Sequence, residues 1–238
     1  MSTLRKQPSK LKLDSPKEIW EREYETLQII PSSSRTVPAK ALLLFSELLN
    51  FKNIEKVLDA GCGPGRNAVY LAQQGCQVDA VDFSEVALSQ LRKLAAETGT
   101  DRNIRTWNHA LEDDLPFEDD SYDLILDSYV SCHFIDENLK QYYRKELLRI
   151  AKPGGIVFST QFSVEDEYYK TLVKNGAGRG KIVVDPNNNV TKQLYTEDEI
   201  KLFFSEDFKL LYFVKFEFDD VVLGQTYRRS IFVLIMRK

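Results

Sequence analysis

Residues 57–72 read VLDAGCGPGRNAVYLA and place three glycines between a short apolar run and an amphipathic segment. The apolar run predicts a buried strand, and the amphipathic segment predicts a helix. Glycines at 61, 63 and 65 let the backbone turn sharply and come close to a ligand. The sequence therefore predicts a binding loop at the carboxyl end of a strand.

Around this loop, strand patterns alternate with helix patterns, which is typical of parallel strands joined by crossover helices. The strand patterns are KVLDA (56–60), QVDAVD (77–82), NIRTW (103–107), YDLILDSYV (122–130) and GGIVFSTQF (154–162). Two alternating segments, FKLLYFVKFEF (208–218) and RRSIFVLIMRK (228–238), predict a terminal antiparallel hairpin. The expected fold is α/β and doubly wound, a Rossmann-like, mostly parallel sheet of seven strands with a C-terminal hairpin.

The rest of the chain predicts additions to this single domain, which we expect to span residues 17–238. Residues 1–16 are basic and poor in apolar side chains, so we expect a disordered tail. Residues 17–50 predict a helical cap, and KEIWEREYETLQII (17–30) has helical apolar spacing. This helix either covers the core or closes as a lid over a site. Residues 161–195 predict a substrate-loop insertion, and Thr196 with Glu199 predicts a capping box for the next helix.

Composition excludes several classes of function. The chain has 238 residues and a net charge of −4, which argues against wholesale nucleic-acid binding. It has no apolar run long enough for a membrane span and no apolar secretory signal, so the expected compartment is the cytoplasm. The three cysteines are widely spaced and predict free thiols, and no cluster predicts a metal site. A small-molecule partner is expected.

The glycine spacing and the end of the next strand indicate the class of ligand, which is a cofactor that contains adenosine. The G-x-G-x-x-G frame of dinucleotide-binding proteins would require glycine at position 66, where the chain has Arg66. Asp82 ends the next strand, where a carboxylate can accept hydrogen bonds from both hydroxyls of a ribose. A simpler interpretation of Asp82 is an acid that is favoured by the dipole of the following helix.

Four segments together resemble the class I S-adenosylmethionine-dependent methyltransferases. They are VLDAGCGPGRNAVYLA, VDAVDFS, LPFEDDSYDLIL and AKPGG, in an order and spacing that agree over residues 55–160. The stretch GRNAVYLAQQG further resembles the small-molecule branch that includes tellurite-resistance and thiopurine methyltransferases. The resemblance implies S-adenosylmethionine as cofactor, S-adenosylhomocysteine as product, and a small-molecule methyl acceptor. The oligomeric state does not follow from it.

The resemblance also implies roles at the cofactor site. Asp59, Gly61, Cys62 and Gly63 would bound the methionine end of the cofactor. Arg66 would either form a salt bridge with a nearby acid or contact an anion, such as the carboxylate of the cofactor. Asp82 would hold the ribose.

The adenine end departs from the family pattern. Phe83 would lie against the adenine face or, alternatively, pack in the core. His109 stands where many family members have an acid that accepts from the adenine amino group. Either Glu112 or Asp113 supplies that acceptor, or the backbone near Ala110 and Leu111 reads the adenine.

The stretch LDSYVSCHF (126–134) would face cofactor and acceptor together. Asp127 is assigned to the cofactor side of this stretch. His133 is the candidate general base, because the usual pKa of histidine suits proton removal, with Tyr129 as a second catalytic candidate. A histidine that is merely hydrogen-bonded at a helix start is the alternative. The substrate-binding candidates are aromatic residues: Trp20, Tyr24 and Tyr168.

Two other functions share parts of this pattern. A nicotinamide-dependent oxidoreductase would use the same fold and Asp82, but it leaves LPFEDDSYDLIL and AKPGG unexplained. A module that binds the cofactor without catalysis would explain all four segments, but it needs no acceptor site. Arg228, before the last strand, predicts a surface ion pair rather than a substrate contact.

Overall fold

The computed structural model describes residues 15–26 and 29–238. The predicted tail therefore falls almost wholly outside the described residues. The helices are α1 (Pro16–Thr26), α2 (Pro31–Ser34), α3 (Lys40–Phe45), α4 (Arg66–Gln73), α5 (Glu85–Thr98), α6 (Glu137–Ile150), α7 (Glu167–Lys174) and α8 (Glu197–Ser205). Short 3-10 helices are η1 (Ser46–Leu49), η2 (Phe51–Asn53), η3 (Asp101–Asn103) and η4 (Ser131–His133).

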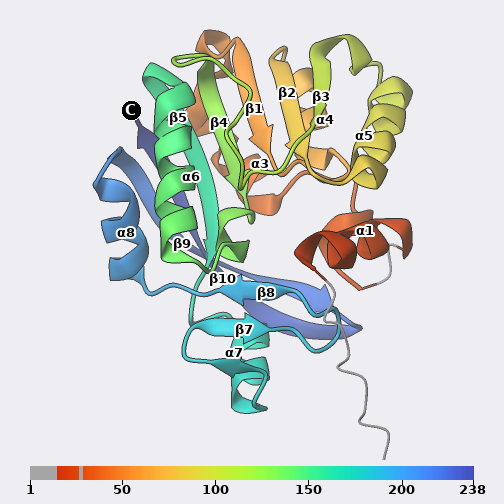
Figure 1. The fold of residues 1–238 in the computed structure, drawn as a ribbon, viewed down its shortest axis with the longest axis vertical. Coiled ribbons are helices and arrows are strands. Elements are labelled where there is room, and N and C mark those ends of the chain that lie inside the picture. Colours follow the sequence, from red (N-terminus) through yellow and green to blue (C-terminus); the bar gives the residue numbers. More distant parts are fainter. Residues whose placement is uncertain (1–14, 27–28) are drawn as a thin grey trace, which may run out of the picture.

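Seven strands form one sheet in the order β3-β2-β1-β4-β5-β10-β9 (Figure 1). The five parallel strands are β1 (Lys56–Ala60), β2 (Gln77–Asp82), β3 (Ile104–Asn108), β4 (Tyr122–Ser128) and β5 (Ala151–Phe162). The last two, β9 (Lys209–Val222) and β10 (Gln225–Arg237), pair antiparallel with each other, and β10 pairs antiparallel with β5. The predicted seven-stranded fold with its terminal hairpin is confirmed.

Helices cover both faces of this sheet, as alternate side chains of β1 show. Val57 packs in an apolar cluster with residues of α3, α4 and α5, such as Leu42 and Leu91. The next residue, Leu58, packs in a second cluster with residues of α6 and α8, such as Leu147. Residues 57–60 of β1 are buried between the two clusters, which places the end of the strand, and the loop that follows, on a rigid support.

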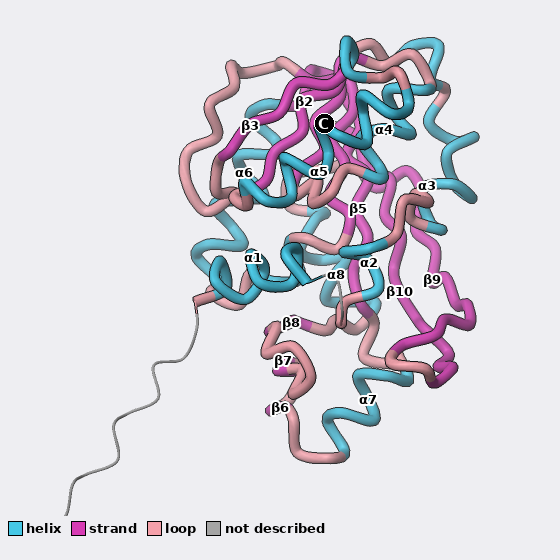
Figure 2. Tube along the Cα trace, turned by 90° about the vertical axis from the view of Figure 1, so that its right-hand side faces the viewer, coloured by secondary structure: helices cyan, strands magenta, loops and turns pink. Residues whose placement is uncertain are grey.

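The insertion after β5 forms a small second sheet. It consists of β6 (Gly178–Arg179), β7 (Ile182–Val184) and β8 (Thr191–Gln193), all antiparallel. Together with α7 it lies beyond the carboxyl ends of the parallel strands, where α1 also lies (Figure 2). The apolar spacing of AKALLLFSELLNF (39–51) also predicts a single amphipathic helix, and this prediction is wrong: α3 ends at Phe45 and two 3-10 helices follow, with Asn50 in the left-handed region at φ 44°.

The predicted helix starts are confirmed. The Ser84 hydroxyl accepts from the amide of Ala87 at the start of α5. Thr196 and Glu199 form the predicted capping box of α8. Among the described residues, no helix has the length and apolar character of a membrane span.

Candidate active site

The loop after β1 turns tightly because its glycines adopt conformations that other residues avoid. Gly61 and Gly65 have φ values of 65° and 90°. A Cβ at Gly61 would lie 2.5 Å from Cγ2 of Val130, and a Cβ at Gly65 would lie 1.9 Å from Cδ1 of Leu91. Glycine is therefore required both by the backbone conformation and by the packing. The Cys62 amide donates to the carbonyl of Val81, which anchors the loop to β2.

Two buried carboxylates flank this loop. Asp82 accepts hydrogen bonds from the amides of Gly63 and Ser84, both at 2.9 Å. Burial raises the pKa of Asp82 to about 6, although these two amides act in the opposite direction. Burial also raises the pKa of Asp59 to about 7, against the effect of the Arg66 cation. Oδ2 of Asp59 is buried without a hydrogen-bond partner, so this end of the loop holds an unsatisfied acceptor.

Helix α1 closes over the glycine loop. Its Tyr24 is buried, and a Cβ at Gly63 would lie 3.2 Å from the Tyr24 hydroxyl. The Gln90 side chain of α5 donates to the Tyr24 carbonyl at 2.7 Å, and the Ser84 hydroxyl donates to Glu21 at 3.0 Å. Helix α1, which carries Trp20 and Tyr24, is therefore held against the glycine loop and against α5.

The residues predicted to contact adenine lie on either side of the ends of β2 and β3. Phe83 is half-buried and belongs to neither of the two large apolar clusters. Leu111 is buried in the second cluster, and Ala110 is half-buried. The ring of His109 is hydrogen-bonded to the Asp114 carbonyl at 3.0 Å, which ties its own loop together.

Asp127, at the carboxyl end of β4, organises the next loop. It is fully buried, and it accepts from the Ser131 amide and hydroxyl, from the Ser159 hydroxyl and from Gln161. Because all of these donors belong to the fold, the carboxylate stabilises the loop of residues 128–134. It does not occupy an open position beside a ligand. Burial raises the pKa of Asp127, although these donors oppose the effect.

Tyr129, in the loop after β4, has a strained backbone conformation. Its φ is 64°, which is unfavourable for a bulky side chain and is a common property of functional sites. Its ring stacks on Phe162, with centroids 5.0 Å apart. Burial raises its pKa to about 12, although Arg66 and Arg229 lower it, so the hydroxyl stays protonated at neutral pH.

His133 lies at the end of η4 and is neutral. Its Nδ1 lies 3.0 Å from the Thr191 carbonyl of β8 and must carry the proton, because a carbonyl only accepts. Burial, with help from the Lys192 cation, lowers its pKa to about 3. Nε2 is then an acceptor, and the centroid of the His133 ring lies 5.4 Å from that of Trp20 in an edge-on arrangement. His133 is thus a hydrogen-bond acceptor but a weak proton acceptor.

The remaining predicted residues differ in their contacts. Tyr168 is buried and donates to Asp185 at 2.7 Å, which places its hydroxyl behind the site.

Arg66 forms no ion pair or hydrogen bond with any described residue, so the predicted alternative of a salt bridge is not found there. Burial lowers the pKa of Arg66. Cys62, Cys76 and Cys132 are buried free thiols, as predicted.

Sequence reasoning missed two buried cations, Lys192 in β8 and Arg229 in β10. Their side chains are oriented by the same aromatic rings, Phe162 and Tyr169. The neighbouring Arg228, in contrast, pairs with Asp219 and Glu217 at the surface, as predicted.

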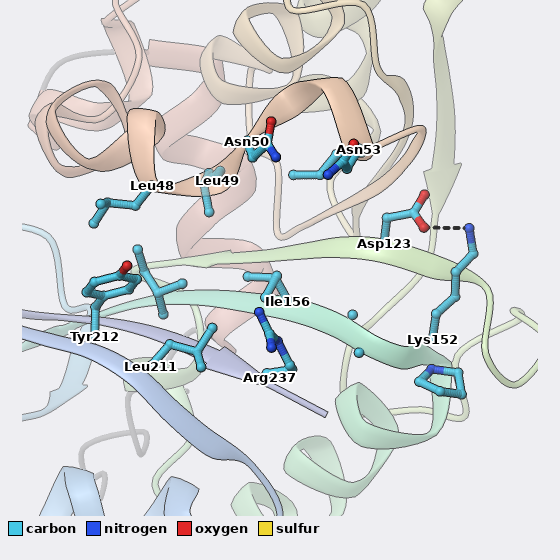
Figure 3. A pocket seen from close by; sticks show the side chains of 15 residues that line it. Leu48, Leu49, Asn50, Asn53, Asp123, Lys152, Ile156, Leu211, Tyr212 and Arg237 are labelled. Carbon is cyan, nitrogen blue, oxygen red and sulfur yellow. Dashed lines mark hydrogen bonds and ion pairs between the residues drawn. The ribbon is translucent and has the colours of Figure 1, made fainter.

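A separate cavity of about 520 Å³ lies at the opposite edge of the sheet, where the parallel strands begin (Figure 3). Two of its charged residues, Asp123 and Lys152, form an ion pair with each other at 2.6 Å, and Arg237 also lines it. None of the predicted site residues lines this cavity. The candidate site is therefore the carboxyl edge, where the loop, the lid helix and the insertion meet.

Part of the chain is similar to known proteins. Residues 57–155 match the family described as a methyltransferase domain. A demethylmenaquinone methyltransferase of Clavibacter sepedonicus is 38% identical over 112 residues, which cover 46% of this chain and 42% of that protein. For the first curated relatives that it matches, the aligned part spans between 25% and 54% of their own length.

Solved structures share the whole fold. A 1,6-didemethyltoxoflavin N1-methyltransferase of Burkholderia thailandensis, solved with 1,6-didemethyltoxoflavin and S-adenosylhomocysteine, has a TM-score of 0.67 at 19% identity, over 97% of this chain and 93% of its own. A protein of echinomycin biosynthesis, linked to conversion of a disulfide bond into a thioacetal group, has a TM-score of 0.71 at 20% identity, over 93% and 92% of the two chains.

Proposed function

We propose that this chain, whose residues 57–155 match the methyltransferase-domain family, transfers a methyl group from S-adenosylmethionine to a small molecule. One observation carries the proposal: the buried carboxylates of Asp59 and Asp82 flank a glycine loop at adjacent strand ends. This arrangement suits a ligand that has both an ammonium group and a ribose.

The residues of this edge fit the cofactor. The unpartnered Oδ2 of Asp59 is an acceptor for the ammonium of its methionine end. Each oxygen of Asp82 already accepts one backbone amide, and because a carboxylate offers about four acceptor positions, two remain for the ribose hydroxyls. Phe83 offers a free aromatic face for adenine, with the backbone of Ala110 and Leu111 beside it.

When bound, the cofactor supplies a methyl group on a sulfonium, which is already a good leaving group. The protein's own contribution is then alignment and exclusion of water, which can supply roughly 7–11 kcal/mol of the acceleration. Trp20 and Tyr24 close the site from α1, and Tyr129 and His133 border it from the loop after β4. With its pKa near 3, His133 orients a donor group of the acceptor through Nε2 and does not store a proton.

Within the methyltransferase class we infer the small-molecule branch. The stretch GRNAVYLAQQG supports the narrower likeness to tellurite-resistance and thiopurine methyltransferases. The curated relatives include proteins named for small acceptors, such as the glycine/sarcosine/dimethylglycine N-methyltransferase of Actinopolyspora halophila. The helical cap of residues 17–50 and the insertion 161–195 would both belong to the acceptor side of a single domain.

The test is binding followed by transfer. S-adenosylmethionine and S-adenosylhomocysteine, each at about 100 times its dissociation constant, should each stabilise the protein by roughly 2.7 kcal/mol, and NADH should not. Label from methyl-labelled S-adenosylmethionine should then pass to a component of a small-molecule cell extract. Stabilisation by NADH alone would support an oxidoreductase, and binding without any transfer would support a non-catalytic module; either result would overturn the proposal.

A further inference from the structure

Lys192 is a buried cation that forms no direct ion pair with any residue the structure describes, although Asp185 and Asp166 attract it from a distance. Its side chain is 7% exposed, and no residue in the described part of the chain gives its Nζ a hydrogen bond or ion pair. Three aromatic rings surround the ammonium, those of Trp20, Phe162 and Tyr169, at 5.9–6.0 Å. Burial lowers the pKa of Lys192. A buried cation without a partner is costly, so an external anion would be strongly favoured here.

Arg229 supplies a second donor to the same place. Its Nε donates to Asp166 at 2.8 Å, but its Nη2 is buried without a partner. The guanidinium lies 5.4 Å from the ring of Phe162 and 5.3 Å from that of Tyr169. The two cations therefore share two aromatic rings, and Nη2 of Arg229 is a buried donor without a partner.

The carboxylates of this region do not fill the gap. Asp166 is engaged by Arg229 and by the amides of Ser230 and Tyr169. Asp185 accepts from the Tyr168 hydroxyl and from Asn187, and it forms no ion pair with Lys192. Both of these carboxylates thus already accept hydrogen bonds from other residues.

This pair of donors borders the candidate acceptor site. Lys192 follows Thr191, whose carbonyl holds His133, and the ring of Trp20 lies both beside Lys192 and edge-on to His133. Resting on the proposed function, we propose that the methyl acceptor is a planar aromatic acid. Its carboxylate is bound by Nζ of Lys192 and Nη2 of Arg229, and its ring lies among Trp20, Phe162 and Tyr169.

The test uses wild-type protein saturated with S-adenosylhomocysteine and four matched probe pairs. The acids are benzoate, salicylate, anthranilate and 4-hydroxybenzoate, and each is compared with its primary amide by thermal shift and by isothermal titration calorimetry. We expect at least one acid to bind about tenfold or more tightly than its amide, because only the carboxylate satisfies the buried cations.

Variants assign the effect to Lys192. Lys192→Met should weaken binding of that acid about tenfold or more, and Lys192→Arg should restore part of it. Lys174→Met, which removes an exposed lysine of the same insertion, should change nothing. Because methionine replaces an unpaired buried charge by an apolar chain of similar length, Lys192→Met should also keep or raise the melting temperature.

The outcomes separate the two proposals. Equal binding of acids and amides, an unchanged acid affinity in Lys192→Met, or no binding of any acid at about 10 mM would overturn the aromatic-acid proposal, since that concentration saturates even a millimolar site. Failure of wild-type protein to bind S-adenosylhomocysteine would instead overturn the proposed function. Affinity for S-adenosylhomocysteine should be the same in wild type and Lys192→Met.

Discussion

Oδ2 of Asp82 accepts a hydrogen bond of 2.9 Å from the amide of Gly63, and this bond ties the end of β2 to the loop that follows β1. The other oxygen accepts from Ser84 at the start of α5. One side chain thus fixes the loop and the helix start while keeping acceptor positions for a ligand. We therefore expect truncation of Asp82 to remove both its ligand-binding role and its structural role. A substitution that keeps the shape of the side chain should separate the two roles.

Asp82→Asn is that substitution. Asparagine keeps the shape but has one acceptor oxygen, so it loses one backbone hydrogen bond and the negative charge. Affinity for S-adenosylhomocysteine should fall roughly ten- to hundredfold, which corresponds to about 1.5–3 kcal/mol for hydrogen bonds to a charged group. Isothermal titration calorimetry measures it, with the exposed Asp101→Asn as control. An affinity within twofold of wild type would remove Asp82 from the site.

The raised pKa of Asp59 predicts an unusual pH dependence of stability. Between the ordinary value of 3.8 and about 7, the folded state binds more protons at Asp59 than the unfolded state does. The contribution of this residue to the free energy of unfolding is therefore complete below pH 3.8 and is lost as the pH rises through about 7. Urea unfolding without ligand should show this as a difference from Asp59→Asn, which should gain relative stability from pH 5 to pH 8. A pH-independent difference would contradict it.

The framework of the fold was predictable because its signals are local and repeated. Each parallel strand is a short apolar run next to a helix with clear caps, such as Ser84 for α5. The substrate insertion gave no comparable signal, because β6 has two residues and β7 and β8 have three each. Strands that short have no readable period.

The cofactor side of the site was likewise more predictable than the acceptor side. Asp59 and Asp82 end strands, and parallel topology alone brings such ends together. Lys192 and Arg229 come from β8 and β10, and only the tertiary packing brings them to the same rings. The run of buried residues from Arg229 to Met236 was the one available sign that Arg229, unlike Arg228, points inward.

The tautomer of His133 makes a prediction for spectroscopy. Its ring should remain neutral with the proton on Nδ1 across pH 5–8, because burial holds its pKa near 3 and the Thr191 carbonyl accepts from Nδ1. Its contribution to stability should be complete above about pH 6.5 and diminish as the pH falls toward 3, opposite in sign to that of Asp59. Long-range ¹H–¹⁵N spectra, assigned with His133→Gln, test this. A titration near 6.5 would restore the general-base role.

The close approach of the glycine loop to α5 can be measured with a matched pair of substitutions. Gly65 and Gly75 have nearly the same φ, 90° and 92°, but a Cβ at Gly65 would lie 1.9 Å from Cδ1 and 2.9 Å from Cβ of the buried Leu91, whereas Gly75 faces open space. Gly75→Ala should cost only the backbone strain, about 1–2 kcal/mol. Gly65→Ala should cost roughly 1–3 kcal/mol more, from overpacking.

Urea unfolding of both variants measures this difference, and a double-mutant cycle with Leu91→Ala assigns it. Removing the Leu91 side chain should recover much of the extra loss in Gly65→Ala, with a coupling energy of roughly 1 kcal/mol or more, since the two residues are in direct contact. No coupling is expected between Gly75→Ala and Leu91→Ala. Equal losses in the two glycine variants, or additive energies in the Gly65 cycle, would mean that the loop can move away from α5. The conclusion that packing against Leu91 requires glycine at position 65 would then be wrong.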